Sequence, residues 1–152
     1  MDINFAQEKD LETVSMITRT TIKEIYPKYY PAGAVDFFCK YHSEDKIKAA
    51  IQKGRVFLLE DEGQKVGTVS IKDNHIYRLF VLPEYQGKGY GRALMDFAEE
   101  KVFENNDTVE LDSSLPAKNI YIKRGYKETE YHVVDTDNGD FLCYDVMVKN
   151  KK

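Results

Sequence analysis

A buried strand that runs through a glycine-rich loop into an amphipathic helix is the feature that most limits how this chain folds. Residues 76–82 are a mostly apolar run, residues 86–91 read Q-G-K-G-Y-G, and apolar side chains recur at helical spacing from about Arg92 to Phe103. Glycines at alternating positions strip most Cβ atoms from the loop, so its backbone N–H groups can converge on an anion. The dipole of the following helix adds partial positive charge, and Lys88 and Arg92 flank the loop. This combination is typical of a phosphate or pyrophosphate site.

Two familiar phosphate-binding motifs do not fit this loop. In a Walker A motif the lysine is followed by Ser or Thr, whereas Lys88 is followed by Gly89. In the dinucleotide-binding motif G-x-G-x-x-G the third glycine would stand at the position of Arg92. Taken alone, the loop also fits a glycine-rich turn that binds nothing.

The rest of the chain predicts a mixed α/β domain. Apolar positions recur with helical period in the first third of the chain, and shorter apolar or alternating runs follow. We expect helices at residues 11–26, 34–41, 43–51, 92–103 and 116–124, and strands at residues 2–6, 55–60, 65–71, 76–82, 108–112, 126–134 and 141–148. The chain of 152 residues contains no repeat or Pro/Ser-rich linker, so we expect one domain over residues 1–152.

Composition excludes several classes of protein. The 22 basic and 26 acidic residues give a net charge of −4, which disfavours a nucleic-acid partner. No apolar run approaches the ~20 residues of a membrane-spanning helix, and the N-terminus does not resemble a signal peptide, so we expect no membrane partner. Cys39 and Cys143 are far apart and no His/Cys/Asp cluster has metal spacing, so we expect neither a disulfide nor a metal, and a cytoplasmic protein.

Two motifs resemble those of a known family. Gln86-x-x-Gly89-x-Gly91 resembles the Q/R-x-x-G-x-G/A signature of the GNAT superfamily of N-acetyltransferases, and residues 111–126 are similar to that family's strand and helix ending in F-Y-x-x-x-G-F. The order of elements matches over essentially the whole chain. The resemblance implies an α/β (α+β) fold of the GNAT type, with a mixed, mostly antiparallel sheet of about seven strands flanked by helices.

The chain departs from the family pattern at three places. Ile120 stands where an aromatic residue is usual, and Tyr126 replaces a phenylalanine. Ser114 or Pro116 occupies the place of an asparagine that contacts the cofactor in many relatives.

The resemblance implies an N-acetyltransferase that moves an acetyl group from acetyl-CoA to an amine by direct attack in a ternary complex. It assigns acetyl-CoA binding to the fourth strand and the glycine loop, here Phe80, Val81, Gln86, Gly87, Lys88, Gly89, Tyr90, Gly91 and Arg92. The alternative is a non-catalytic acyl-CoA-binding sensor or interaction module on the same fold, because a fold does not by itself determine a function.

Tyr121 is the candidate general acid, since it matches the family's tyrosine four residues before Gly125. A phenol has a pKa of ~10 in model peptides, so it is protonated at neutral pH and can donate to the sulfur of CoA. The general base stays open between His75, Tyr77 and Asp112, which stand on or beside the expected cleft.

The acceptor site is expected near three tyrosines, Tyr26, Tyr29 and Tyr30, between the first two helices. Aromatic faces attract ammonium groups, although aromatic packing explains the same residues equally well. We therefore expect a small-molecule or peptidyl amine as the acceptor. A homodimer is compatible with the resemblance, since relatives are often dimers.

Overall fold

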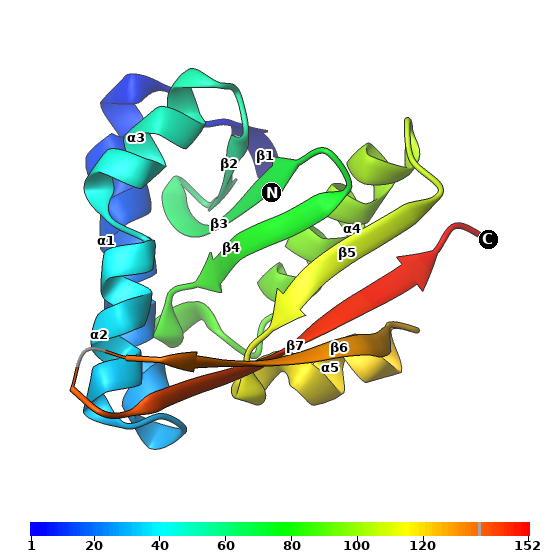
Figure 1. The fold of residues 1–152 in the computed structure, drawn as a ribbon. Coiled ribbons are helices and arrows are strands. Elements are labelled where there is room, and N and C mark those ends of the chain that lie inside the picture. The colour runs from blue at the N-terminus through cyan, green and yellow to red at the C-terminus, as the bar shows by residue number, and fades with distance from the viewer. Residues whose placement is uncertain (137) are drawn as a thin grey trace.

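The computed structural model describes residues 1–136 and 138–152, in which seven strands form one sheet (Figure 1). In order across the sheet, the strands are β1 (Asp2–Phe5), β2 (Val56–Asp61), β3 (Gln64–Lys72), β4 (His75–Val81), β5 (Thr108–Ser113), β7 (Phe141–Asn150) and β6 (Lys127–Asp135). Neighbouring strands are antiparallel except β4 and β5, which run parallel. The mixed, mostly antiparallel sheet expected from the resemblance is confirmed.

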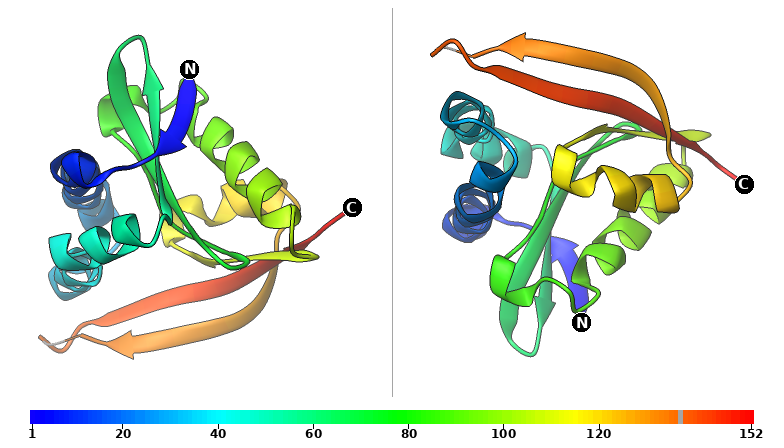
Figure 2. Two further views of the ribbon diagram at one scale, coloured as in Figure 1. Left: turned by 90° about the horizontal axis from the view of Figure 1, so that it is seen from above. Right: turned by 90° about the horizontal axis from the view of Figure 1, so that it is seen from below.

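Helices cover both faces of this sheet (Figure 2). One face carries α1 (Leu11–Ile25), α2 (Ala32–Tyr41) and α3 (Glu44–Gln52), and the other carries α4 (Tyr90–Phe103) and α5 (Lys118–Lys123). Each face has its own cluster of buried apolar side chains. The sheet is therefore the middle layer of three, and its central strands are buried on both sides.

The local sequence explains why these elements begin and end where they do. Val14, Ile17 and Ile22 lie on one face of α1 and are fully buried, and Pro27 follows shortly after the helix ends. The side chain of Ser43 accepts a hydrogen bond from the backbone of Lys46 at the start of α3, as expected of an N-cap. All the helices and strands expected from the sequence are present, with boundaries that differ by about two residues.

Strands β4 and β5 separate soon after they meet. Their register joins only His75 to Glu110, and beyond that pair the two strands diverge. On its other edge β4 pairs with β3, but the register shifts between Thr68 and Ser70, where two residues of β4 oppose one of β3. Arg78 lies in this bulge with φ 49°, a left-handed conformation that few non-glycine residues adopt. Strand β4 is thus separated from β5 along most of one edge, and its pairing with β3 is irregular along the other.

The hairpin of β6 and β7 reaches back to the first helices. The Asp140 carboxylate accepts a hydrogen bond of 2.8 Å from the backbone N–H of Gly33, in α2. The turn expected between these strands includes Asp137, which lies outside the described residues. Across the described residues, no helix is both long and apolar enough to cross a membrane.

Candidate functional site

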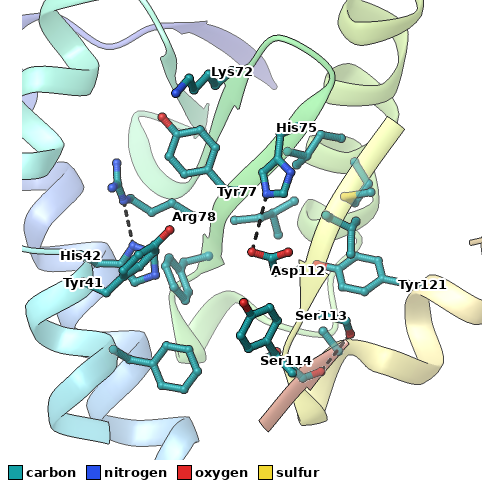
Figure 3. A pocket seen from close by; sticks show the side chains of 18 of the residues that line it. Tyr41, His42, Lys72, His75, Tyr77, Arg78, Asp112, Ser113, Ser114 and Tyr121 are labelled. Atoms are coloured by element: carbon teal, nitrogen blue, oxygen red, sulfur yellow. Dashed lines mark hydrogen bonds and ion pairs between the residues drawn. The ribbon is translucent and has the colours of Figure 1, made fainter. Parts of the chain in front are cut away.

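A cavity of about 830 Å³ opens where β4 and β5 diverge. Its walls come from both strands, from α2, and from the first turn of α4 and residues in and near α5 (Figure 3). The size is within the range of ~300–1,000 Å³ that is usual for small-molecule sites. All three base candidates, His75, Tyr77 and Asp112, and the acid candidate Tyr121 line this one cavity.

The glycine loop leads into α4, whose first turn lines the cavity through Gly91 and Arg92. Gly87 has φ 79° and Gly89, the N-cap of α4, has φ 90°. These are left-handed conformations that glycine adopts without a steric cost. A Cβ atom built on Gly87, Gly89 or Gly91 would meet no other atom within 4 Å, so the space in front of the loop is open. The first N–H groups of a helix lack intrahelical partners, so this loop has both the donors and the space for an anion.

Side chains next to the loop hold it in place or supply charge. The Gln86 amide donates a hydrogen bond of 2.9 Å to the carbonyl of Val81, which ties the loop to the end of β4. Arg92 lines the cavity, whereas the Lys88 ammonium lies over the Tyr85 ring at 5.3 Å. The Tyr90 hydroxyl donates to Asp61 at 2.7 Å, and this bond raises the pKa of Tyr90 to about 12.

Because its side chain is tied to Asp61, Tyr90 is left with its backbone to offer a ligand. The two strand residues assigned to the cofactor differ in where their side chains lie. Phe80 lines the cavity, whereas Val81 packs in the core under α4. Within the segment that the sequence predicts to bind the cofactor, the structure separates the side chains that face the cavity from those that anchor the segment.

Tyr121 projects from α5 towards the cavity (Figure 3). Its ring packs against the Tyr126 ring, with centroids 5.7 Å apart and planes at 61°. Burial raises the pKa of Tyr121 to about 12, so the hydroxyl is protonated at neutral pH. Within the described part of the chain, the hydroxyl makes no hydrogen bond, and it is available to a ligand.

A buried carboxylate fixes the end of the segment that carries Tyr121. Glu99 of α4 accepts hydrogen bonds from the Arg124 guanidinium at 2.7 Å, the Tyr126 hydroxyl at 3.0 Å and the Lys149 ammonium at 3.2 Å. These bonds join α4, the residues after α5, and β7. Breaking such a buried ionic network usually costs ~3–5 kcal/mol, so the network holds α5 firmly against the cavity.

The three base candidates lie close together across the two strands. The His75 Nε2 atom is 3.9 Å from the Asp112 carboxylate, and its Nδ1 atom is 3.9 Å from the Glu110 carboxylate. The Tyr77 ring centroid is 6.3 Å from that of His75. Sequence reasoning missed Glu110, although it stands two residues before Asp112 and so shares its face of the strand.

The aromatic segment divides between cavity and core. Tyr26 is buried and lines the cavity, while Tyr30 is buried outside the cavity wall and Tyr29 is 51% exposed. The Tyr30 hydroxyl accepts a hydrogen bond of 2.7 Å from the backbone of Leu115, and burial raises the pKa of Tyr30. Both buried rings pack against Phe38 with centroids about 5 Å away. Of the three tyrosines, the structure brings only Tyr26 into the cavity, and the aromatic cluster that fixes Leu115 is largely core.

Arg78 is a cavity residue that sequence reasoning missed. Its Nε atom donates a hydrogen bond of 3.1 Å to Nδ1 of His42, and its guanidinium lies 5.2 Å from the Tyr77 ring centroid (Figure 3). Burial lowers the pKa of His42 to about 3, and the charges of Arg78 and Lys46 act in the same direction. His42 is therefore a neutral acceptor. The signal for this pair was a single arginine within an otherwise apolar strand.

The cavity thus combines a helix start with open space for an anion, a protonated phenol and a histidine that lies 3.9 Å from each of two carboxylates. Among the described residues, no group of three or more His, Cys, Asp or Glu is arranged to hold a metal ion. The arrangement can bind an elongated phosphate-containing molecule, donate one proton and accept another.

Comparisons with known proteins agree with this chemistry. Residues 25–139 match the family described as the acetyltransferase (GNAT) domain. An uncharacterized N-acetyltransferase encoded in the pepI 3′ region of Lactobacillus delbrueckii subsp. lactis is 28% identical, over 93% of this chain and 94% of that protein.

Two solved structures share the fold over nearly the whole chain. A GCN5-related N-acetyltransferase from Rhodopseudomonas palustris superimposes with a TM-score of 0.87 at 24% identity, covering 99% of this chain and 95% of that one. The PaiA N-acetyltransferase from Thermoplasma acidophilum, solved in complex with coenzyme A, has a TM-score of 0.73 at 22% identity and covers 99% and 98% of the two chains.

Proposed function

Because the chain belongs to the acetyltransferase (GNAT) family, we propose that it transfers an acetyl group from acetyl-CoA to an amine by direct attack in a ternary complex. The observation that carries the proposal is one continuous cavity between β4 and β5, which joins the first turn of α4 to Tyr121 and to the His75–Asp112 pair. The acceptor is a small-molecule or peptidyl amine.

The residues present fit acetyl-CoA. The open space in front of Gly87, Gly89 and Gly91 and the start of the 14-residue helix α4 suit a pyrophosphate, and Arg92 adds charge beside it. Among the described residues, the edge of β4 that faces away from β3 has no register partner beyond His75, so it can pair with an extended arm. Acetyl-CoA supplies an acetyl thioester, which has a good leaving group.

In this proposal, side chains of the protein donate and accept the protons. As the amine nitrogen bonds to the acetyl carbon, the carbon–sulfur bond breaks, and the departing thiolate needs a proton. Tyr121 is the donor, because its raised pKa keeps it protonated and its hydroxyl has no competing partner among the described residues. Burial and the absence of such a partner support this role over a purely structural one.

His75 is the best-supported base for the incoming ammonium. An alkylammonium must lose a proton before its nitrogen can attack. His75 lines the cavity, and the Glu110 and Asp112 carboxylates lie 3.9 Å from its two ring nitrogens. Tyr77 and Asp112 line the same wall and remain alternatives, with Asp112 acting on the proton directly or through His75.

Two measurements test the proposal against the non-catalytic sensor. Calorimetry with acetyl-CoA measures binding, and release of free thiol with a panel of primary amines measures transfer. We expect metal-independent binding, and thiol release above the rate without amine for at least one member of the panel. Binding without thiol release for every amine would favour the sensor.

A further inference from the structure

Arg78 is a buried cation for which the described part of the protein provides no counter-ion. The side chain is only 7% exposed, yet no carboxylate of the described residues lies within 4.0 Å of its nitrogens. Its Nε atom bonds to neutral His42, and its buried Nη1 atom has no hydrogen-bond partner. Buried arginines are normally paired, because an unpaired buried charge is costly.

The protein also maintains this arrangement at a conformational cost. Arg78 occupies the β4 bulge at φ 49°, a conformation that is disfavoured for a residue with a side chain. The Tyr77 ring, 5.2 Å from the guanidinium, offsets part of the burial cost through a cation–π contact, but it does not satisfy the Nη1 hydrogens. An unsatisfied donor on the wall of a cavity points to a ligand that accepts from it.

Charged side chains of both signs line the cavity. Arg55 precedes β2, and Lys72, at the end of β3, pairs in register with His75. The acidic side chain of Asp112 lies on the β5 side, beside His75 (Figure 3). Arg78 and His42 lie on the α2 side. The cavity is therefore polarised across its width.

The phosphates of acetyl-CoA do not explain Arg78. The glycine loop begins α4, whereas the Arg78 guanidinium bonds to the residue that follows α2, and these two helices cover opposite faces of the sheet (Figure 2). A pyrophosphate on the glycine loop would therefore leave the guanidinium unpaired.

We propose that Arg78 binds a carboxylate of the acceptor, so that the substrate is a molecule carrying both an amine and a carboxylate. This inference rests on the proposed function and names its substrate class. A carboxylate on the planar guanidinium would satisfy Nη1 and neutralise the buried charge, and the amine of the same molecule would face His75 and Asp112. The carboxylate belongs either to a free amino acid or to an acidic side chain at a peptide N-terminus.

Matched amines distinguish these sources and test the residue. One pair is alanine and alaninamide, which differ in the α-carboxylate. The other is aspartyl-alaninamide and asparaginyl-alaninamide, which differ only in the side-chain carboxylate. Thiol release with acetyl-CoA gives kcat and KM for each amine, and calorimetry on the CoA-saturated protein gives binding whether or not transfer occurs.

We expect the wild type to prefer the acid of at least one pair. Arg78→Gln should lower kcat/KM for that acid by about 10- to 100-fold, mainly through KM, and change its amide partner less than about threefold. Arg78→Lys should recover part of the loss. Arg19→Gln removes an exposed arginine of α1 outside the cavity. It should leave kcat/KM unchanged for the acid and for its amide partner.

Two results would overturn the inference: a wild type without preference for either acid, or an Arg78→Gln protein impaired equally towards an acid and its amide. The second result would make Arg78 a brace between β4 and α2. A different result would mean that the proposed acetyl transfer is wrong while the role of Arg78 holds. In that case the acids would bind to the CoA-loaded wild type and not to Arg78→Gln, but no amine would release thiol.

Discussion

At the scale of single residues, the proposed chemistry rests on the phenol of Tyr121, which is protonated at neutral pH. Replacing Tyr121 by Phe removes the proton donor and keeps the ring that packs on Tyr126. We predict that kcat for thiol release falls by ~10²–10⁴-fold, the usual scale for losing a general acid, while acetyl-CoA affinity in calorimetry hardly changes.

Tyr126→Phe is the matched control for this substitution. It removes a neighbouring hydroxyl, which bonds to Glu99, so it should lower thermal stability and leave kcat nearly intact. Equal kcat values for wild type and Tyr121→Phe would mean that Tyr121 only packs against its neighbours and does not donate the proton.

His42 makes a prediction about stability and pH. Burial lowers its pKa to about 3 in the folded protein, against an ordinary value of 6.5, so below pH 6.5 the unfolded chain binds more protons than the folded one. The contribution of neutral His42 to stability is present above pH 6.5 and is lost as the pH falls towards 3. We predict that His42→Gln, which keeps an acceptor for Arg78, shows a smaller drop in melting temperature between pH 7.5 and pH 5 than the wild type.

The wild type and His42→Gln carry the same carboxylates, so acid titration of those groups contributes equally to their two curves of melting temperature against pH. Parallel curves for wild type and variant would mean that His42 takes up a proton in the folded state without difficulty, and that Arg78 does not oppose it.

The sequence predicts a role for Tyr121 but gives no prediction for Arg78, and the reason is physical. Tyr121 stands at a fixed spacing from Gly125, so a motif finds it. The pairing of Arg78 with His42 joins residues 36 positions apart in the chain, and it depends on a bulge that turns the arginine towards α2. The structure places Tyr30 in the core, outside the cavity wall. The sequence could not show this, because an aromatic residue in a loop gives no sign of whether it faces a ligand or the core.

At the scale of elements, periodicity predicts the helices and strands, but their register depends on tertiary contacts. The strands of residues 75–81 and 108–113 are each recognisable from their apolar residues. The two strands meet at His75 and Glu110 and then separate, and no local sequence pattern encodes this register. The cavity is a product of that divergence.

In the proposed function, acetyl-CoA binding depends most on the start of α4. Gly89→Asp places a Cβ and a negative charge in the open space where a pyrophosphate would approach, at φ 90°. We predict that acetyl-CoA binding is lost in calorimetry.

Gly63→Asp is the matched control, because Gly63 has φ 76° and equally open surroundings but lies in the turn between β2 and β3. Both variants carry a similar backbone strain, of order 1–3 kcal/mol, so their melting temperatures should fall by similar amounts. Wild-type affinity in Gly89→Asp would remove the loop from the cofactor site.

At the scale of the whole molecule, the cavity is lined by residues from both helical layers. The helices α4 and α5 bring the glycine loop and Tyr121, whereas α2 and its neighbours bring His42 and support Arg78. The bond between Gly33 and Asp140 closes the β6–β7 hairpin over the second layer. The sheet between the layers holds His75 and Asp112 where the two substrates would meet.

Acetyl transfer itself is tested most directly by following the acetyl group. The purified protein is incubated with acetyl-CoA labelled in the acetyl carbons and with the matched amines, and the products and the intact protein are weighed by mass spectrometry. We predict that the label appears on an amine nitrogen in a one-to-one ratio with free CoA thiol, and that the mass of the protein does not change. Label that remains on acetyl-CoA with every amine, or that accumulates on the protein, would contradict direct transfer in a ternary complex.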